Sequence, residues 1–423
     1  MKSLGHQSQD AGKSMEKEGS SIETRPRRTP PWRIGYCTNV HAGPNLEQAQ
    51  ANLQQYAVPI RQSVTPNEPL PVGLWLAEPA AKTLAESGNV SRFRDWLKQH
   101  QLFPFTFNGF PQGDFHQPVV KHRVYLPTWD DPARRDYTLL LIDHLHHLLP
   151  TGEIGSISTL PLGWGTPAWT DEQFTLAALH LSEVAQRLQQ LEEATGRYIA
   201  LAIEPEPGCV LDTAHDVCQF FSRYLSAPAT SQRNRRYLTV CHDICHAAVM
   251  FESQQDFFDQ LRQEGLLIGK VQVSAALEVR WNELDDVGQS RTLEFLSQFA
   301  EDRYLHQTGV FSHGHFQLWE DLPQLLKTKQ RGMSVQTWRV HFHVPISEAR
   351  IGELHSTQAE IMKCVELLQS PTYDDLCPTG HLEVETYAWS VIPAHLRQTD
   401  LAASISRELN WLRTGIANSN ASR

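Results

Sequence analysis

The amino-acid sequence predicts an α/β protein, a single (β/α)8 barrel of the TIM type. Short runs rich in β-branched and aromatic residues alternate with longer stretches of helical periodicity from Trp32 onward, as in a sheet built from βα units. A chain of 423 residues suits a barrel with insertions as well as two or three average domains. The runs show no internal repeat and no interdomain linker between them, which favours one barrel.

Nine segments have the composition of strands, one more than a barrel of eight needs. They are Arg33–Val40, Val72–Ala77, Pro104–Asn108, Ser156–Leu160, Tyr198–Glu204, Tyr237–Asp243, Ile268–Ser274, Val340–Ile346 and Leu382–Thr386. Helices are expected between them. The clearest is Glu172–Thr195, where apolar residues recur at helical spacing, namely Leu176, Leu179, Leu181, Val184, Ala185, Leu188 and Leu191.

The barrel is expected to span residues 31–415 and to carry an insertion before its last strand. The interval Ala275–Arg339 is too long for a simple βα turn, so we place the insertion at about 276–338, over the barrel mouth. The ninth strand candidate belongs to this insertion or to the segment just after it. Residues 1–30 are polar, which predicts a disordered tail, and residues 416–423 are expected to form a flexible C-terminus.

Composition excludes several classes of partner and compartment. The net charge of −11, without a long basic stripe, argues against nucleic acid. No run of about 18 consecutive apolar residues is present, so direct membrane insertion is not expected. The seven cysteines are scattered and show no CxxC pair, which indicates reduced thiols in a cytoplasmic protein. Glycine-rich nucleotide motifs and the GxSxG motif are absent.

Acidic side chains end several of the predicted strands, where a barrel places its active site. Glu204 ends YIALAIE, Asp243 ends YLTVCHD with His246 three residues later, and Glu383 and Glu385 share one face of LEVET. Converging buried carboxylates need a cation, and a divalent metal such as Mg, Mn, Co or Zn is the simplest one. The alternative is that each acid pairs with an arginine.

Three further side chains extend this candidate metal site. His341 and His343 in VHFHVPI share a face if that segment is a strand, a familiar spacing for metal ligands. They fit equally well as hydrogen-bonded histidines lining a polar cavity. Gln272 ends KVQVS and its amide can ligate a metal or bind a substrate hydroxyl.

Polar and aromatic residues cluster after the third predicted strand, in FNGFPQGDFHQPVVKHRVYLPTW. Such a mixture suits a sugar-like ligand, and loops at this end of a barrel carry function disproportionately. The alternative is a structured surface loop whose aromatic residues pack on the barrel rim. The candidate substrate-binding residues are Asn108, His116, Lys121 and Trp129, with Phe110 and Tyr125 beside them.

The order Glu204, Asp243, His246, Glu385 resembles that of the xylose isomerase-like barrel superfamily of sugar isomerases and epimerases. More narrowly, FTFNGFPQGDFH, VKHRVYLPTWDDPARRDYT, SISTLPLG, RVHFHVPI and LEVETYAW look like EboE-type metabolite traffic proteins. The superfamily resemblance implies a Glu, Asp, His, Glu ligand set on successive strands. Its third place is filled by Gln272 if KVQVS is strand seven, or by His343 if VHFHVPI is.

The resemblance implies a protein of a secondary-metabolite pathway, with a small-molecule metabolite and other proteins of the same pathway cluster as partners. The favoured function is a metal-dependent isomerase or epimerase of a polyhydroxylated or carbonyl metabolite, with Glu204 or Glu385 moving the proton. The alternative is a non-catalytic metabolite-binding barrel. Metal-dependent hydrolysis is a third possibility, less favoured because the His-x-His pair comes late in the chain.

Overall fold

Eight parallel strands close into a barrel in the computed structural model, which describes residues 32–41, 43–114, 116–328, 336–387, 392–393 and 400–421. The order around the barrel is β1, β14, β7, β6, β5, β4, β3, β2. The strands are β1 (Arg33–Cys37), β2 (Leu70–Leu74), β3 (Leu102–Asn108), β4 (Gly155–Thr159), β5 (Ile199–Ile203), β6 (Leu238–Asp243), β7 (Ile268–Val273) and β14 (His381–Val384). The predicted (β/α)8 fold is confirmed. The expected N-terminal tail lies outside the described residues.

Eight of the nine strand candidates coincide with barrel strands, and the ninth, Val340–Ile346, does not. Val340 ends β11 (Gln336–Val340), a strand of a second sheet, and residues 341–345 belong to no helix or strand. The prediction of a strand there was therefore wrong. Its alternation of apolar and polar residues has another cause: Phe342 and Val344 are buried in the apolar core, while His341 and His343 face a polar cavity.

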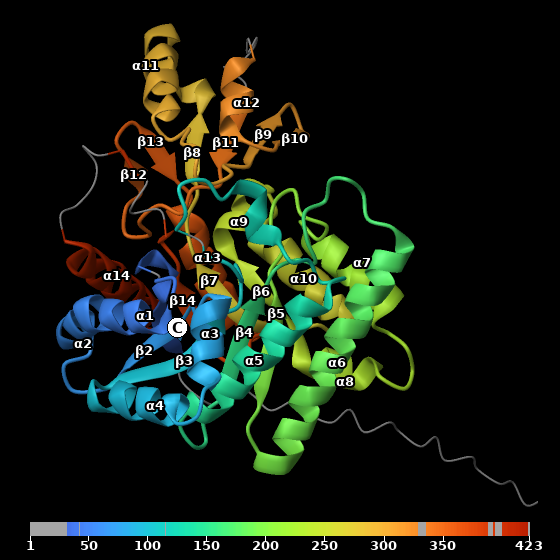
Figure 1. The fold of residues 1–423 in the computed structure, drawn as a ribbon. Coiled ribbons are helices and arrows are strands. Elements are labelled where there is room, and N and C mark those ends of the chain that lie inside the picture. The colour runs from blue at the N-terminus through green and yellow to red at the C-terminus, as the bar shows by residue number, and fades with distance from the viewer. Residues whose placement is uncertain are drawn as a thin grey trace, which may run out of the picture.

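Helices surround the barrel on its outer side (Figure 1). They are α1 (Leu46–Asn52), α2 (Val58–Val64), α3 (Glu78–Ala85), α4 (Asn89–Gln99), α5 (Pro132–Leu148), α6 (Asp171–Thr195), α7 (Ala214–Tyr224), α8 (Ser231–Tyr237), α9 (Ile244–Val249), α10 (Gln254–Glu264), α13 (Gln358–Gln369) and α14 (Leu401–Ala421). Helix α14 continues through residue 416, where the sequence predicts that a flexible C-terminus begins. No helix in the described part of the chain is long and apolar enough to cross a membrane.

Helix α6 shows how sequence defines a barrel helix. Thr170 and Gln173 form a capping box at its start, and Gly196 ends it with a φ of 71°, a left-handed conformation that favours glycine. Most of the predicted apolar stripe is buried against the barrel, but Leu176 and Leu179 are exposed at 38% and 53%. Small and polar residues, Ala177, Ala178 and His180, take the buried positions at that end.

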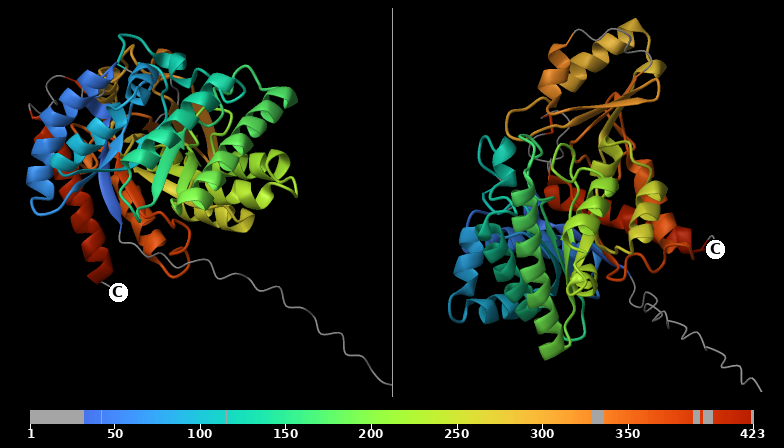
Figure 2. Two further views of the ribbon diagram at one scale, coloured as in Figure 1. Left: turned by 60° about the horizontal axis from the view of Figure 1, so that its bottom comes forward. Right: turned by 90° about the vertical axis from the view of Figure 1, so that its right-hand side faces the viewer.

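The insertion forms a second, antiparallel sheet at one end of the barrel, seen in Figure 1 and in the right-hand view of Figure 2. Its strand order is β10, β9, β11, β8, β13, β12. These strands are β8 (Leu277–Arg280), β9 (Thr308–Ser312), β10 (His315–Trp319), β11, β12 (Arg350–Ile351) and β13 (Leu354–Ser356), with helices α11 (Asp286–Ser297) and α12 (Leu322–Lys327). The sheet continues past the expected end at residue 338.

The barrel interior is built from polar layers. Near the start of the strands, the Ser156 hydroxyl lies 2.8 Å from His381 Nδ1. One layer further, Lys270 and Glu383 form a fully buried ion pair of 2.5 Å. Gly73 makes room for that pair, because a Cβ at this position would lie 1.3 Å from a Glu383 carboxylate oxygen. The next layer, at the carboxyl ends of the strands, contains the candidate site.

Candidate metal centre

Three carboxylates meet at the carboxyl ends of the barrel strands. Glu204 follows β5 directly, Asp243 is the last residue of β6, and Glu385 follows β14 directly. The three side chains are buried, and each offers a carboxylate oxygen within 4.8 Å of the other two. The strand-end carboxylates that the sequence indicates are therefore brought together.

Hydrogen bonds orient two of these carboxylates and leave donor atoms free. Glu385 Oε1 accepts the Asn39 side-chain amide at 2.6 Å and that of Asn108 at 3.0 Å. Asp243 Oδ1 accepts the Ser274 hydroxyl at 2.8 Å. Glu204 Oε2 and Asp243 Oδ2 are buried without a hydrogen-bond partner. Buried charged oxygens of this kind call for a cation, so the residues fit a divalent metal.

Crowding changes the acidity of these groups. Burial, followed by the neighbouring Asp243 and Glu383 carboxylates, raises the pKa of Glu385 to about 8. Burial, followed by Glu385 and Asp243, raises the pKa of Glu204 well above its ordinary value. Burial also acts to raise the pKa of Asp243, but His246 and His343 beside it lower that pKa below its ordinary value. Asp243 is thus the carboxylate that stays ionised most readily.

The three-residue spacing of Asp243 and His246 has a local structural cause. Asp243 is the N-cap of helix α9, and its Oδ1 accepts the backbone N–H of His246 at 2.9 Å. This bond places the His246 side chain within the first turn of α9. An aspartate that caps a helix therefore also positions a histidine at the same end of the barrel.

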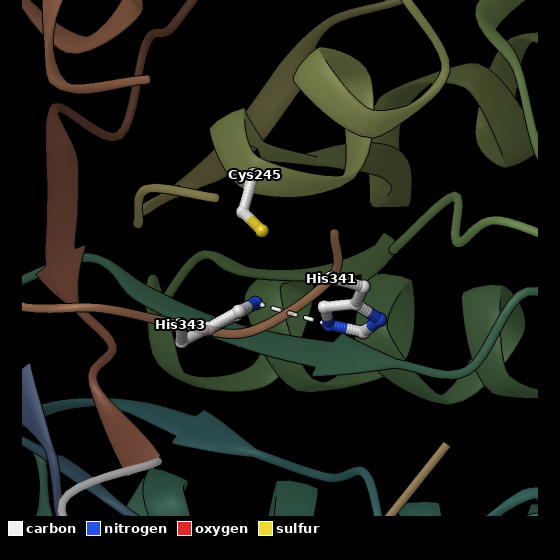
Figure 3. A group of neighbouring side chains, drawn as sticks. All are labelled: Cys245, His341 and His343. Atoms are coloured by element: carbon white, nitrogen blue, oxygen red, sulfur yellow. Dashed lines mark hydrogen bonds between the residues drawn. The ribbon is translucent and has the colours of Figure 1, made fainter. Parts of the chain in front are cut away.

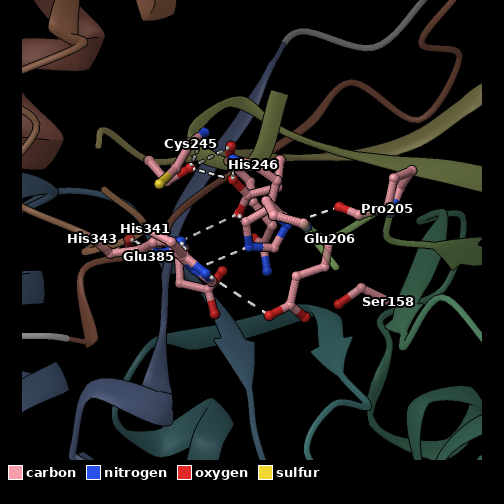
Figure 4. Close-up of polar contacts among 12 residues, drawn as sticks. Ser158, Pro205, Glu206, Cys245, His246, His341, His343 and Glu385 are labelled. Carbon is pink, nitrogen blue, oxygen red and sulfur yellow. Dashed lines mark hydrogen bonds and ion pairs between the residues drawn. The ribbon is translucent and has the colours of Figure 1, made fainter. Parts of the chain in front are cut away.

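His246 meets His341 and His343 in a compact cluster of imidazoles. His341 Nε2 lies 3.2 Å from His246 Nε2 and 3.2 Å from His343 Nε2. Figure 3 shows His341 and His343 with the Cys245 thiol beside them, and Figure 4 shows the wider set of contacts. Each of these 3.2 Å contacts is a hydrogen bond only if one of its two nitrogens carries a proton.

The other ring nitrogens show where the protons are. His246 Nδ1 lies 2.8 Å from the carbonyl oxygen of Pro205, and His343 Nδ1 lies 3.0 Å from that of Glu385. A carbonyl oxygen only accepts, so both Nδ1 atoms donate. In the neutral rings of His246 and His343 the Nε2 atoms therefore carry lone pairs.

Gln307 fixes the same tautomer in His341. Its Nε2 donates to Glu206 Oε1 at 3.1 Å and to the Pro207 carbonyl at 3.2 Å, which turns its Oε1 toward His341 Nδ1 at 2.8 Å. Tyr125 also donates to Glu206 Oε1, at 2.7 Å. His341 Nδ1 must therefore donate to Gln307, and its Nε2 also carries a lone pair.

Burial keeps two of these rings neutral. Burial, followed by repulsion from the neighbouring imidazoles, lowers the pKa of His341 well below its ordinary value. Burial lowers the pKa of His343 to about 4, although the nearby Asp243 acts to raise it. Neutral imidazoles with free Nε2 atoms are the form in which histidine binds metals.

Asp243 lies between the carboxylates and the imidazoles. Its unpaired Oδ2 lies 3.8 Å from His343 Nε2 and 4.0 Å from His246 Nε2, and its carboxylate also groups with those of Glu204 and Glu385. We call Glu204, Asp243 and Glu385 the carboxylate cluster, and His246, His341 and His343 the histidine cluster.

Gln272 stands on β7 in register with Asp243 on β6 and Glu383 on β14. KVQVS is therefore strand seven, and Gln272, not His343, occupies the third strand place. Its side chain is fully buried, and neither its Nε2 nor its Oε1 has a hydrogen-bond partner. His343 reaches the site from the insertion instead. The ligand role of either residue stays a prediction.

A cavity of about 60 Å³ opens between the two clusters. Of the predicted substrate-binding residues, Asn108 and Lys121 line it. Lys121 Nζ lies 2.6 Å from Asp321 Oδ2 of the insertion, an ion pair at the cavity edge. Trp129 is fully buried and donates its indole N–H to Thr159, and His116 Nε2 lies 2.8 Å from the Asn39 carbonyl oxygen. Neither Trp129 nor His116 lines the cavity.

The lining or supporting residues that were missed in the sequence include Asn39, Glu206, Gln307 and Tyr387. Glu206 follows Glu204 by two positions in EPEPG, and this second acid could have identified it as a site residue from the sequence. Gln307 lies in the insertion next to strand β9, and nothing in its local sequence distinguishes it. Its role depends on contacts to Glu206 and His341, which lie 101 and 34 positions away.

No model of a known protein family matches the sequence, and no curated protein matches it. Solved structures with similar folds include a D-tagatose 3-epimerase-like protein at 12% identity and a TM-score of 0.47, covering 92% of this chain and 99% of that one. An L-ribulose 3-epimerase matches at 12% identity and a TM-score of 0.48, covering 92% and 96%.

A xylose isomerase-like TIM barrel protein from Mycobacterium smegmatis, in complex with magnesium, matches at 10% identity and a TM-score of 0.49, covering 92% of this chain and 97% of that one. These neighbours are barrels of the sugar-epimerase and xylose isomerase-like kind. What they bind is a property of those proteins, and the chemistry of this chain depends on its own side chains.

Proposed function

We propose that this chain is a divalent-metal-dependent isomerase or epimerase of a small polyhydroxylated or carbonyl metabolite, with Glu204, Asp243 and Glu385 holding the cation. One observation carries the proposal. Three buried carboxylates offer oxygens within 4.8 Å of one another, and oxygens of Glu204 and Asp243 have no hydrogen-bond partner. A cation compensates their desolvation, and oxygen donors suit Mg, Mn or a similar ion.

Glu204, Asp243 and Glu385 would hold a divalent cation, which would supply polarisation of a substrate carbonyl and its neighbouring hydroxyl and so ease proton abstraction next to the carbonyl. The chain's own residues move that proton. Glu204 or Glu385 would accept and return that proton; without a bound ion, burial and neighbouring carboxylates raise the pKa of Glu385 to about 8 and that of Glu204 in the same direction. Glu206 adds a further carboxylate on the cavity wall, and its Oε2 has no hydrogen-bond partner.

The cavity limits the substrate. A volume of about 60 Å³ holds about four water molecules, which favours a small substrate. Asn108 and Lys121 offer an amide and an ammonium group to substrate oxygens.

The second candidate is a barrel that holds a metabolite without converting it, in a secondary-metabolite traffic pathway with partner proteins. Gln272 favours it, because an amide stands at the strand place where the resembled isomerases carry an imidazole ligand. We place either activity in the cytoplasm, since all seven cysteines are free thiols.

The test combines metal analysis with turnover. Purified chain, loaded with Mg or Mn, is incubated in D2O with a panel of small aldoses, ketoses and hydroxy ketones, and proton exchange next to the carbonyl is followed by NMR. We expect exchange in the wild type and its loss in Glu204→Gln and Glu385→Gln. Glu252→Gln, which changes a half-buried carboxyl group away from the site, is the matched control and keeps activity.

The outcomes separate the two candidates. A chain that takes up no divalent ion at the carboxylate cluster overturns the isomerase or epimerase. Metabolite binding that is insensitive to chelator and gives no exchange supports the metabolite-binding barrel instead.

A further inference from the structure

The histidine cluster is distinct from the carboxylates to which the function above is assigned. We propose that His246, His341 and His343 bind a second divalent ion, of the zinc class, so that the chain carries two metal sites sharing Asp243. This proposal concerns metal binding alone and does not depend on the isomerase or epimerase activity.

Two of the three Nε2–Nε2 spacings in the cluster are those of ligands around one ion. Each Nδ1 donates to an oxygen of Pro205, Gln307 or Glu385, so each neutral ring directs an unprotonated Nε2 toward the others. His341 Nε2 lies 3.2 Å from each of its two neighbours. Imidazole nitrogens bound tetrahedrally to zinc lie about 3.3 Å apart, given metal–nitrogen distances of about 2.0–2.1 Å.

Lone pairs at that distance repel one another unless a proton or a metal cation lies between them. The Tyr387 hydroxyl is a nearby proton donor, but at 3.4 Å from His341 Nε2 it is too far for a strong hydrogen bond. One hydroxyl also cannot satisfy three lone pairs. A metal ion satisfies all three at once, and burial of the cluster makes that compensation necessary.

The groups around the histidine cluster accept hydrogen bonds from its Nδ1 atoms, as the groups around metal-bound histidines do. Metal-binding histidines almost always donate their second N–H to a carbonyl or carboxylate oxygen, which fixes the ring and its tautomer. Here two backbone carbonyls and one glutamine amide play that part, and Gln307 is itself held by Glu206 and Pro207. A fourth ligand is available in Asp243, whose unpaired Oδ2 lies 3.8 Å from His343 Nε2.

The two clusters should prefer different metals. The histidine cluster offers three nitrogens, which suit Zn or Co, whereas the carboxylate cluster offers oxygens, which suit Mg or Mn. The nitrogen ligands also come from two parts of the fold, His246 from helix α9 and His341 and His343 from the segment that follows β11. An ion there joins the insertion to the barrel.

The test counts the ions. Full-length chain is stripped with chelator, supplied with Zn and Mn together, desalted and analysed by elemental mass spectrometry. We expect two ions per wild-type chain and one in His341→Ala and in His343→Ala, with zinc lost. His306→Gln replaces a buried histidine of the same insertion whose Nε2 faces Glu301, and it keeps both ions. Glu385→Gln loses the manganese and keeps the zinc.

Cys245 needs its own variant, because its thiol also lies near His341 and His343. Cys245→Ser keeps both ions if the three imidazoles hold the zinc. X-ray absorption at the zinc edge of the wild-type chain, which does not depend on any variant folding, is expected to show a shell rich in imidazole nitrogen.

A wild-type chain that never exceeds one ion, a His341→Ala chain that retains both ions, or a zinc shell made of oxygen alone overturns the second site. The proposed catalytic function can fail separately. Absence of turnover leaves the two-ion count standing, and turnover with one ion per chain removes only the second site.

Discussion

The Nε2 atom of His246 lies 3.2 Å from the Nε2 atom of His341, although the two residues are 95 positions apart in the sequence. One comes from the helix that follows barrel strand β6, and the other follows the last residue of an insertion strand, β11. The insertion is therefore part of the site and not only a cover over it. Its sheet, its ion pair to Lys121 and its glutamine at position 307 all act on the same cavity.

Gln307 is expected to act as a positioning residue for the histidine cluster. Gln307→Leu removes the acceptor of His341 Nδ1–H and frees the ring to rotate, so zinc affinity should fall about 10-fold to 100-fold. Competition with a coloured chelator measures the change. Gln317→Leu, on an exposed position of strand β10, is the control and keeps wild-type affinity. An unchanged zinc affinity in Gln307→Leu would show that the glutamine does not orient the ring.

The ion pair of Lys121 and Asp321 is expected to restrain the insertion over the cavity. Lys121→Met keeps most of the aliphatic stem but removes the 2.6 Å ion pair. A partly buried ion pair contributes about 1 kcal/mol. Its loss should therefore increase the rate at which chelator removes bound metal by about fivefold. Stopped-flow chelation measures this rate, with the exposed Lys98→Met as control. Equal rates in the two variants would contradict the restraint.

Lys270 and Glu383 should be among the most sensitive positions for stability. Lys270→Met leaves the Glu383 carboxylate buried without its 2.5 Å partner, so the free energy of unfolding should fall, by about 3–5 kcal/mol. The double variant with Glu383→Gln removes the stranded charge and should lose less than Lys270→Met alone. Denaturant unfolding measures both.

The control for that prediction is Lys82→Met, which breaks an exposed pair with Glu78 and should cost less than about 1 kcal/mol. If the double variant is as unstable as Lys270→Met, the uncompensated charge is not the cause of the loss.

Glu252 should make the chain less stable as pH rises. Burial, together with Asp212, Asp216 and Asp256, raises the pKa of Glu252 to about 8, although the backbone N–H of Ala214 donates to it. The folded chain therefore holds a proton that the unfolded chain releases at a lower pH. This stabilisation is complete below the unfolded pKa and is lost as pH rises toward 8.

Glu252→Gln stays neutral and can still accept the Ala214 N–H. The variant should match the wild type near pH 4 and exceed its free energy of unfolding by about 4–5 kcal/mol near pH 8.5. Unfolding curves recorded at several pH values give the comparison. Parallel pH profiles for the two chains would contradict a raised pKa at this position.

Local sequence patterns were sufficient for the barrel and for part of its site. Each barrel strand is a short buried run, and the acids that end three of them had to converge, because parallel strands end at the same rim. Asp243 and His246 were also predictable as neighbours, since the aspartate caps the helix that carries the histidine. The sequence left the third strand place open between Gln272 and His343, and the structure assigns it to Gln272 on β7; the metal role of any of these residues stays a prediction.

The sequence by itself determined the barrel fold, the strand-end acids of the carboxylate cluster and the approximate place of the insertion, because these follow from the periodicity of short segments. Only the tertiary structure decided that VHFHVPI is not a barrel strand, that Trp129 packs in the core, and that His341 joins His246. The physical reason is that these contacts join residues far apart in the sequence. The histidine cluster and its support by Gln307 arise where an irregular segment of the insertion returns to the barrel rim, and no local periodicity records contacts between residues so far apart in the chain.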